Sequence, residues 1–343
     1  MLVKKKSILL RKVNFLMAFL IVISINADAQ NKVYPSEITV DKSMNGNYKT
    51  IQEAINSIRD LGEKEVKILV KNGTYREKVI IPSWKIKIHI IGESKENTII
   101  TFDDYAGKPN PSGKDAFGID KFSTFTSYTF LVQANDISLE NLTIINAAGR
   151  VGQAVALHVE GDRFAAKNCR FLGNQDTLFA TDENRRQYYF NCFIEGTTDF
   201  IFGKATAVFE NCTIKSLTNS YITAAATSAN QTFGFVFINC KLIAADGVNK
   251  VYLGRPWRPF AKTVFIKSDL GNHVVPEGWN PWKGDAMFPD KEKTALYAEY
   301  KNTGQNAGVK NRVVWAKQLT DKEAKLYSVK NILKGADTWN PLK

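Results

Sequence analysis

A short phrase recurs along the middle of the chain: Asn-Cys, then a variable residue, then an apolar one. It begins at Asn168, Asn191, Asn211 and Asn239, and a related phrase without cysteine begins at Asn141. Successive phrases are thus separated by roughly 20 to 30 residues, and each interval holds short alternating apolar segments, which is typical of one coil of a solenoid. Leucine-rich repeats share the period but need several leucines at fixed offsets, so the sequence predicts a parallel β-helix.

In such a fold each phrase lies above the one before it. We expect the cysteine and the following apolar residue to stack inside, and the asparagine to form a hydrogen-bonded ladder at a bend. Residues 66–70, 86–91 and 98–102 read as further strands, and the repeat fades beyond about residue 290. The apolar spacing in residues 49–61 after Thr50 predicts a short helix that closes the N-terminal end, and residues 321–326 predict a second.

The N-terminus has the pattern of an export signal. A basic segment precedes the apolar run 13–25, and Ala27-Asp28-Ala29 supplies a small-x-small cleavage site. An N-terminal membrane anchor is the alternative, but this run falls short of the roughly 20 residues that span a bilayer. We therefore expect a signal peptide over residues 1–29, a single all-β domain over residues 30–343, and a secreted or periplasmic protein. The basic residues of that segment are Lys4, Lys5, Lys6, Arg11 and Lys12.

The composition excludes several classes of protein. With 44% hydrophobic and 23% charged residues the chain fits neither a disordered nor a multi-span membrane protein. Removing residues 1–29 takes away five basic residues and one acidic residue, which lowers the net charge from +12 but leaves a clear positive excess. This positive excess favours an anionic partner. The sequence has no zinc-finger spacing, RNP1-like motif or arginine-rich arm, which counts against nucleic acid and favours a partner such as a uronic-acid polysaccharide.

The four cysteines leave two possibilities open. All of them occupy one position of the repeat, so they can be a column of buried thiols. Strands of neighbouring coils are about 4.8 Å apart, which also lies within the Cα separation of a disulfide, and Cys192 with Cys212 across the shortest step is the candidate pair.

The candidate chemistry lies in polar residues that follow the coil period. Gln153, Asp176 and Asp199 are evenly spaced along the chain by one coil each, and Gln175 precedes Asp176. Two carboxylates one coil apart repel each other, which separates their affinities for protons and yields an acid and a nucleophile. The two glutamine amides can donate hydrogen bonds to a developing oxyanion. The alternative is a ladder of polar side chains that merely decorates one face.

A second cluster is the turn 253–258, where glycine and proline can aim Arg255 and Trp257 back at the groove. Arg255 can keep Asp199 ionised through a charge-assisted hydrogen bond. Trp257 and Trp282 can stack on sugar rings, although tryptophan in a turn is often only packing.

With these residues in view, the chain resembles the pectin methylesterase (pectinesterase) family over nearly all of its length after residue 29. The resemblance implies a right-handed parallel β-helix and the hydrolysis of galacturonate methyl esters without a cofactor or metal. The implied partner is methyl-esterified homogalacturonan, with no nucleic acid, no membrane after signal cleavage, and a monomeric enzyme. The matching phrases are Gly73-Thr74-Tyr75-Arg76-Glu77, Gln153-Ala154-Val155-Ala156-Leu157, Gln175-Asp176-Thr177-Leu178, Asp199-Phe200-Ile201-Phe202-Gly203 and Leu253-Gly254-Arg255-Pro256-Trp257.

The resemblance also implies roles. Asp199 is similar to the nucleophile, Asp176 to the general acid and then base, and Arg255 to the partner of Asp199. Gln153 and Gln175 are similar to the oxyanion donors. The family often has tyrosine where this chain has Phe179, so a hydroxyl contact to substrate is expected to be missing. The residues expected to contact substrate are Trp257, Phe200, Phe179 and Trp282.

Two other functions remain open. Two carboxylates about 5 Å apart also suit a retaining glycoside hydrolase acting on galacturonan. The paired glutamines and the arginine count against it. A non-catalytic polysaccharide-binding protein would need the aromatic residues and the basic surface, but not the five polar residues together.

Overall fold

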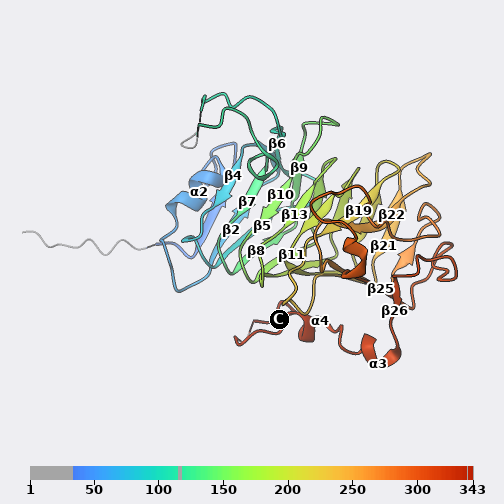
Figure 1. The fold of residues 1–343 in the computed structure, drawn as a ribbon. Coiled ribbons are helices and arrows are strands. Elements are labelled where there is room, and N and C mark those ends of the chain that lie inside the picture. Colours follow the sequence, from blue (N-terminus) through green and yellow to red (C-terminus); the bar gives the residue numbers. More distant parts are fainter. Residues whose placement is uncertain (1–33, 115–117, 338, 343) are drawn as a thin grey trace, which may run out of the picture. The chain divides into compact units, whose positions relative to one another are not determined.

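The computed structural model describes residues 34–114, 118–337 and 339–342, and residues 35–343 form one compact unit. The proposed signal peptide, residues 1–29, lies outside the described residues. The described strands form three parallel sheets, which we call A, B and C, and over residues 66–256 the chain passes from A to B to C in each coil (Figure 1). The prediction of an all-β right-handed parallel β-helix is confirmed.

The sheets have 11, 8 and 7 strands. Sheet A contains β1 (Glu37–Val40), β2 (Val66–Val70), β5 (Ile88–Gly92), β8 (Ile137–Glu140), β11 (Phe164–Lys167), β14 (Arg186–Phe190), β17 (Thr206–Glu210), β20 (Phe235–Ile238), β23 (Lys262–Ile266), β25 (Leu296–Tyr300) and β26 (Lys317–Gln318). Sheet B contains β3 (Gly73–Arg76), β6 (Thr98–Phe102), β9 (Thr143–Asn146), β12 (Arg170–Leu172), β15 (Phe193–Gly196), β18 (Thr213–Ser216), β21 (Lys241–Ala244) and β24 (Asp269–Leu270). Sheet C contains β4 (Val79–Ile81), β7 (Phe130–Val132), β10 (Leu157–Val159), β13 (Leu178–Ala180), β16 (Ile201–Gly203), β19 (Tyr221–Ala225) and β22 (Tyr252–Pro256).

The register of sheet A reproduces the asparagine spacing. Glu140 pairs with Lys167, Lys167 with Phe190, Phe190 with Glu210 and Glu210 with Ile238. Each of these residues immediately precedes an asparagine of the phrase, so the steps between paired strands are the steps between asparagines. The asparagines occupy the bend between sheets A and B.

All five of these asparagines have φ between 51° and 56°. Asparagine tolerates this left-handed conformation better than most residues, which explains why it recurs at the bend. Asn168 Nδ2 donates to Asn141 Oδ1 at 2.5 Å, and Asn191 Nδ2 donates to Asn168 Oδ1 at 3.1 Å. The predicted ladder therefore exists over three coils.

The interior is built from stacked columns of like residues. Tyr189, Phe209, Phe237 and Phe265 are register partners in sheet A, and their ring centroids are 4.7, 4.5 and 4.3 Å apart with nearly parallel planes. Face-to-face stacking at this spacing follows from the distance between strands. The four cysteines are also buried and free, so the thiol column is observed and the Cys192–Cys212 disulfide is not.

The N-terminal end of the solenoid is closed by α2 (Ile51–Ser57). Its N-cap is Thr50, which forms a reciprocal capping box with Glu53, and its apolar face is buried. The Glu77 carboxylate accepts hydrogen bonds from the first two amides of the helix, Ile51 N and Gln52 N, both at 3.0 Å. The predicted capping helix is confirmed.

The Asn-Cys phrase ends before the C-terminal end of the solenoid, but sheet A continues there. Strands β25 and β26 extend it in parallel register. The helix predicted over residues 321–326 is α3 (Asp321–Ala324), and α4 (Val329–Ile332) follows it. Val329, Ile332 and Leu333 pack against the outer face of sheet A. The remaining short helices are the 3₁₀ helices η1 (Thr124–Thr126) and η2 (Lys291–Lys293).

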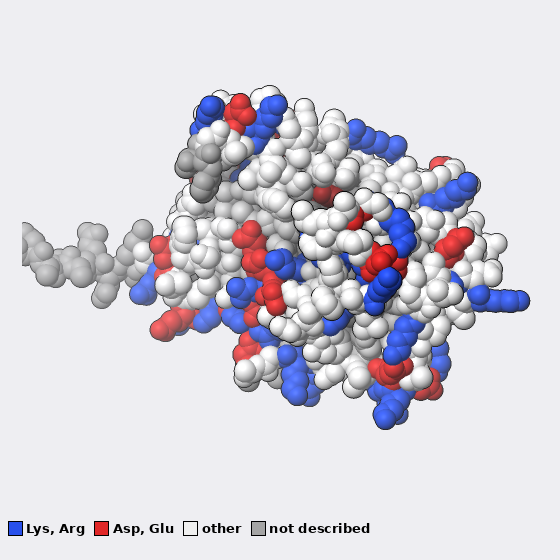
Figure 2. All heavy atoms as spheres, viewed as in Figure 1, with Lys and Arg blue, Asp and Glu red and all other residues white. Residues whose placement is uncertain are grey.

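The surface view in Figure 2 shows Lys and Arg side chains interspersed with Asp and Glu on the face presented. The positive excess is therefore not gathered into one patch on that face. Within the described residues, no helix is both long enough and apolar enough to span a bilayer.

Candidate active site

Asp176 and Asp199 occupy equivalent bends between sheets B and C. Each lies two positions before its sheet C strand, and Leu178 at the start of β13 pairs with Ile201 at the start of β16. The two aspartates are therefore exactly one coil apart. Both have a left-handed backbone, with φ of 67° at Asp176 and 49° at Asp199, as the asparagines have at the bends between sheets A and B. The spacing prediction is correct for these two residues.

Small and hydroxylated neighbours make these bends possible. The Thr177 hydroxyl donates to the carbonyl oxygens of Asn174 at 3.1 Å and Glu195 at 2.9 Å, which ties consecutive coils together. Gly196 packs so closely that an added Cβ would lie 2.2 Å from Phe200 Cβ and 2.6 Å from the Asn174 carbonyl oxygen. A larger residue at position 196 would push apart the bend that carries Asp199.

The two glutamines lie one above the other. Gln153 and Gln175 form an isolated parallel bridge, and neither side-chain amide hydrogen-bonds to another residue that the structure describes. The sequence predicts that Gln153 lies over Asp176, and this prediction is wrong by one position. The coil that begins at Gln153 is shorter than the constant spacing assumed, as the pairing of Leu157 with Leu178 shows. Gln153 therefore stacks on Gln175, and two half-exposed amides lie beside the aspartates.

Arg255 lies two coils after Asp199 and its side chain extends back to that residue. It lies on β22, and its Nε and Nη2 donate to the two carboxylate oxygens of Asp199 at 3.0 and 2.6 Å. The guanidinium lies over the rings of Tyr221 and Trp282, with Cζ 3.9 and 3.6 Å from their centroids. A two-point ion pair whose cation also contacts two aromatic rings is a rigid arrangement. The predicted pairing of Arg255 with Asp199 is present in the geometry.

The two carboxyl groups differ in their surroundings. Burial, and then the charge of Asp199, raise the pKa of Asp176 well above its usual value, and no other described residue hydrogen-bonds to the Asp176 carboxyl group. Burial also raises the pKa of Asp199, but Arg255 and, more weakly, Lys291 act to lower it. Asp176 therefore retains its proton under conditions in which Asp199 has lost its own.

This difference predicts a pH-dependent stability that one substitution removes. Between the unfolded pKa of Asp176, near 3.8, and its raised folded pKa, the unfolded chain has lost this proton while the folded protein keeps it. Wild-type stability should therefore fall as pH rises through this interval, by about 1.4 kcal/mol for each pKa unit of difference. Asp176→Asn should lack this loss, so its melting temperature should exceed that of wild type by a margin that grows with pH. A margin that stays constant from pH 4 to 8 would contradict the raised pKa.

An apolar cluster adjoins the aspartates. Phe179 and Phe202 are stacked, with ring centroids 4.3 Å apart, and Trp257 meets Phe202 edge-on at 5.9 Å. Phe200 is not part of this surface: it is 0% exposed and belongs to the interior core, so the expected contact between Phe200 and substrate is wrong. Phe202, which the sequence analysis quoted but did not select, belongs to the outer aromatic cluster with Phe179, although it is itself buried.

Trp282, expected to stack on sugar, contacts cations of the protein itself, and its contact with substrate stays a prediction. The Arg255 guanidinium and the Lys291 ammonium lie 3.6 and 4.5 Å from its ring centroid, so the ring is engaged by the protein's own cations. Tyr221 and Lys291 were also missed. Tyr221 lies one coil after Asp199, because Ile201 pairs with Thr223, so the coil period marks its position. No repeat spacing marks Lys291, which lies in a loop that contains η2.

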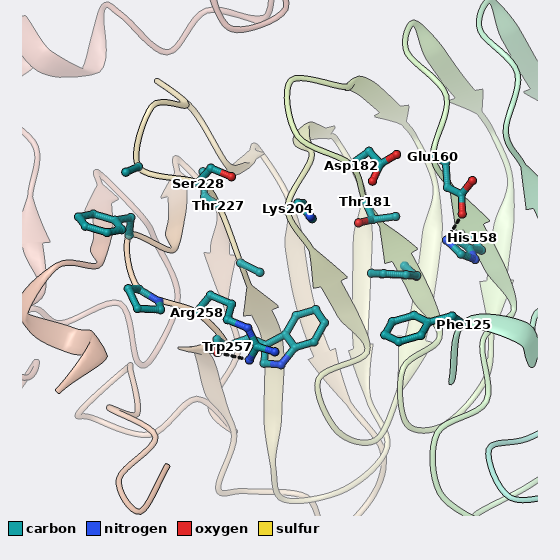
Figure 3. Close-up of a pocket in the computed structure, with 15 residues that line it drawn as sticks. Phe125, His158, Glu160, Thr181, Asp182, Lys204, Thr227, Ser228, Trp257 and Arg258 are labelled. Carbon is teal, nitrogen blue, oxygen red and sulfur yellow. Dashed lines mark hydrogen bonds and ion pairs between the residues drawn. The ribbon is translucent and has the colours of Figure 1, made fainter. Parts of the chain in front are cut away.

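A groove of about 660 Å³ extends from the aromatic cluster along the ends of the sheet C strands. In Figure 3 the rings of Phe125 and Trp257 lie along one edge, while Glu160, Asp182 and Ser228 lie along the other. His158 is buried and lines this groove, with Nε2 3.2 Å from Glu160 Oε1. Among the lining residues, Thr181 and Asp182 follow Asp176 beyond β13, and Lys204 follows Asp199 beyond β16.

A smaller pocket of about 200 Å³ lies on the opposite side of the aspartates. It is lined by Gln175 and by residues that precede Asp176 and Asp199 in the chain, among them Asn174, Thr197 and Thr198. Since the strands run parallel, the aspartates lie between the two hollows. In the part of the chain that the structure describes, no group of three or more His, Cys, Asp or Glu residues is arranged to hold a metal ion.

Comparisons with known proteins agree with one another. A family model described as Pectinesterase matches residues 37–336. A protein of Arabidopsis thaliana that carries the pectinesterase name is 40% identical over 89% of this chain and 81% of its own length. A second protein of the same plant, probable pectinesterase/pectinesterase inhibitor 64, is 37% identical over 89% of this chain, which spans about half (53%) of that longer protein.

Solved structures give the same result. Pectin methylesterase from carrot superimposes with a TM-score of 0.77 at 32% identity, covering 86% of this chain and 92% of its own. A pectin methylesterase in complex with a hexasaccharide superimposes with a TM-score of 0.74, also at 32% identity, covering 88% of this chain and 97% of its own.

Proposed function

The chain belongs to the pectinesterase family of carboxylic ester hydrolases, and on that basis we propose that it hydrolyses the methyl esters of polygalacturonate to pectate and methanol. The observation that carries this proposal is the pair Asp176 and Asp199 on consecutive coils, with Arg255 bound to only one of them. The hexasaccharide complex of a related pectin methylesterase supports an oligosaccharide-binding groove in the same fold.

In the first half-reaction the Asp199 carboxylate attacks the carbonyl carbon of the ester. The carbonyl oxygen becomes an oxyanion, to which the Gln153 and Gln175 amides donate hydrogen bonds. The bond to the methoxy oxygen then breaks as Asp176 gives its proton to that oxygen, because methoxide is a poor leaving group. Methanol departs, and the galacturonyl group is held on Asp199 as an anhydride.

In the second half-reaction Asp176 is a carboxylate and acts as a base. It takes a proton from a water molecule, whose oxygen attacks the galacturonyl carbonyl carbon of the anhydride. The bond to the Asp199 oxygen breaks, which releases the free uronic acid and restores Asp199 as a carboxylate and Asp176 as an acid. Arg255 holds Asp199 in one orientation and favours its charge at the start and the end of the cycle.

The oxyanion role predicts the effect of Gln175→Ala. Loss of one such donor costs about 2.7 to 4 kcal/mol of transition-state stabilisation, so kcat should fall by about 10²- to 10³-fold with little change in KM. Since the Gln175 amide binds no other described residue, the melting temperature should stay near that of wild type. A variant with full kcat, or one whose loss is entirely in KM, would exclude Gln175 as an oxyanion donor.

The test of the proposed function is one incubation of the purified protein with highly methylated polygalacturonate. An esterase releases methanol and leaves the chain length unchanged, whereas a glycoside hydrolase creates new reducing ends. Release of reducing ends without methanol would establish the rival enzyme, and binding without either product would establish a polysaccharide-binding protein.

We also infer that the protein acts outside the cytoplasm as a monomer, after removal of residues 1–29. The supporting observations are the signal pattern in the sequence and the polymeric nature of the proposed substrate. N-terminal sequencing of the exported protein, which should begin at Gln30, and its elution volume in size exclusion test both inferences.

A further inference from the structure

A loop over residues 280–294 lies against Arg255 through the ring of Trp282. It starts beside β22, where Asn280 N donates to the Gly254 carbonyl oxygen at 3.0 Å and Trp279 bridges to Gly254. The Asn280 side chain then accepts a hydrogen bond from Trp282 N at 2.9 Å. These contacts fix where the loop begins, immediately next to Arg255.

The loop is closed by a buried lysine. The Lys291 side chain is 0% exposed, and its Nζ lies 2.6 Å from Asp285 Oδ2. The other carboxylate oxygen of Asp285 accepts from Met287 N at 3.1 Å and Phe288 N at 3.2 Å, so one aspartate both caps a turn and binds the lysine. A buried ammonium group is costly to desolvate and is kept only where its contacts compensate.

Lys291 is connected to the nucleophile by consecutive contacts. Its ammonium lies over Trp282, whose ring also carries the Arg255 guanidinium, and Arg255 holds both oxygens of Asp199. Trp282 has φ of 56°, a backbone conformation that a bulky residue rarely adopts without surrounding support. The ion pair of Lys291 with Asp285 supplies that support from inside the loop.

We propose that Lys291 is a positioning residue for the esterase reaction: its buried ion pair with Asp285 holds Trp282 over Arg255, and thereby holds Arg255 in two-point contact with Asp199. This inference rests on the proposed function, since it concerns the same site. The loop then helps to orient the Asp199 carboxylate, in addition to any contact that it makes with substrate in the groove.

The charges around Asp199 give this role a pH signature. The groups that face Asp199 are Arg255, Lys291, Asp176 and the buried Tyr297. The groups that face Lys291 are Asp285, Arg258 and Arg255. Arg255 and Lys291 both lower the pKa of Asp199, so removing Lys291 should raise that pKa. The acidic limb of the kcat/KM profile, which requires ionised Asp199, should then move to higher pH.

The experiment compares Lys291→Met with Lys293→Met on the full chain. Both variants remove one positive charge from the same loop, but Lys293 is exposed at its side chain (72%) and forms an ion pair with Asp290 at 2.7 Å. Lys291→Met should lower kcat by about ten- to a hundredfold, as expected for a slight misplacement of reacting groups, with a smaller change in KM. Its acidic limb should move to higher pH, whereas Lys293→Met should match wild type in both respects.

A second variant keeps the test decisive if Lys291→Met does not fold. Asp285→Asn/Lys291→Met leaves no unpaired buried charge, and asparagine retains the side-chain oxygen that caps the turn. It should show the same loss of kcat and the same displaced acidic limb. If either folded variant has the kcat and acidic limb of Lys293→Met, the inference is overturned. If wild type itself releases no methanol, the proposed function fails instead, so the two failures are distinguishable.

Discussion

Replacing Asp199 with alanine should abolish methanol release, lowering kcat by at least about 10⁴-fold, because the proposed mechanism assigns the attack on the ester to its carboxylate. Asp199 is the only one of the two aspartates that Arg255 contacts in two-point fashion. The variant should remain folded, since Asp199 lies at a bend between sheets and its carboxylate contributes little to the interior packing. The measurement is methanol release at saturating pectin by protein with a wild-type circular dichroism spectrum.

Two companion variants sharpen this result. Asp199→Asn keeps the shape of the side chain but removes its charge, so it should be as inactive as the alanine variant. Asp246→Ala removes an exposed aspartate from a turn outside the site and should retain full activity. Near wild-type turnover by folded Asp199→Ala would remove Asp199 as the nucleophile and with it the two-step mechanism.

Asp176→Asn should slow both half-reactions, with a loss in kcat of about 10² to 10⁴, the range for general acid–base catalysis. Asparagine cannot protonate methoxide, and it cannot take a proton from water afterwards. Because the pKa of Asp176 is raised well above its usual value, wild type should lose activity at alkaline pH as this proton is lost. The variant should lack that alkaline limb.

This outcome is separable from a general loss of structure. The variant should bind polygalacturonate as wild type does, and its melting temperature should rise rather than fall at neutral pH. A variant that keeps the alkaline limb of wild type would show that a different group supplies the proton.

The sequence was sufficient for the repeating part of the fold because repetition is a local property. The asparagine steps equal the register of sheet A, since each left-handed bend follows a strand directly. The same logic located Asp176 and Asp199 on neighbouring coils. It failed for Gln153, because the coil from β10 to β13 is shorter than the coil from β13 to β16, so a constant period overshoots by one position.

The remaining errors have local causes. Phe200 and Ile201 both belong to the interior core, whereas Phe202 joins the cluster with Phe179 outside it, so simple alternation does not hold through the bend at Asp199. A left-handed residue turns the chain and resets which side faces the interior. The placement of Trp282 and Lys291 depends on a long loop without a repeat. No spacing in the sequence predicts which of its side chains reaches Arg255.

The connections from sheet C back to sheet A have very unequal lengths on successive coils: five residues after β13, two after β16 and nine after β19. All three contribute side chains to the groove, yet the strands before them keep a common register. Insertions and deletions in these connections can therefore reshape the wall of the groove while the reacting carboxylates stay in place. Preference for a pattern of methylation can thus evolve, or be engineered by exchanging loops, independently of the hydrolytic chemistry.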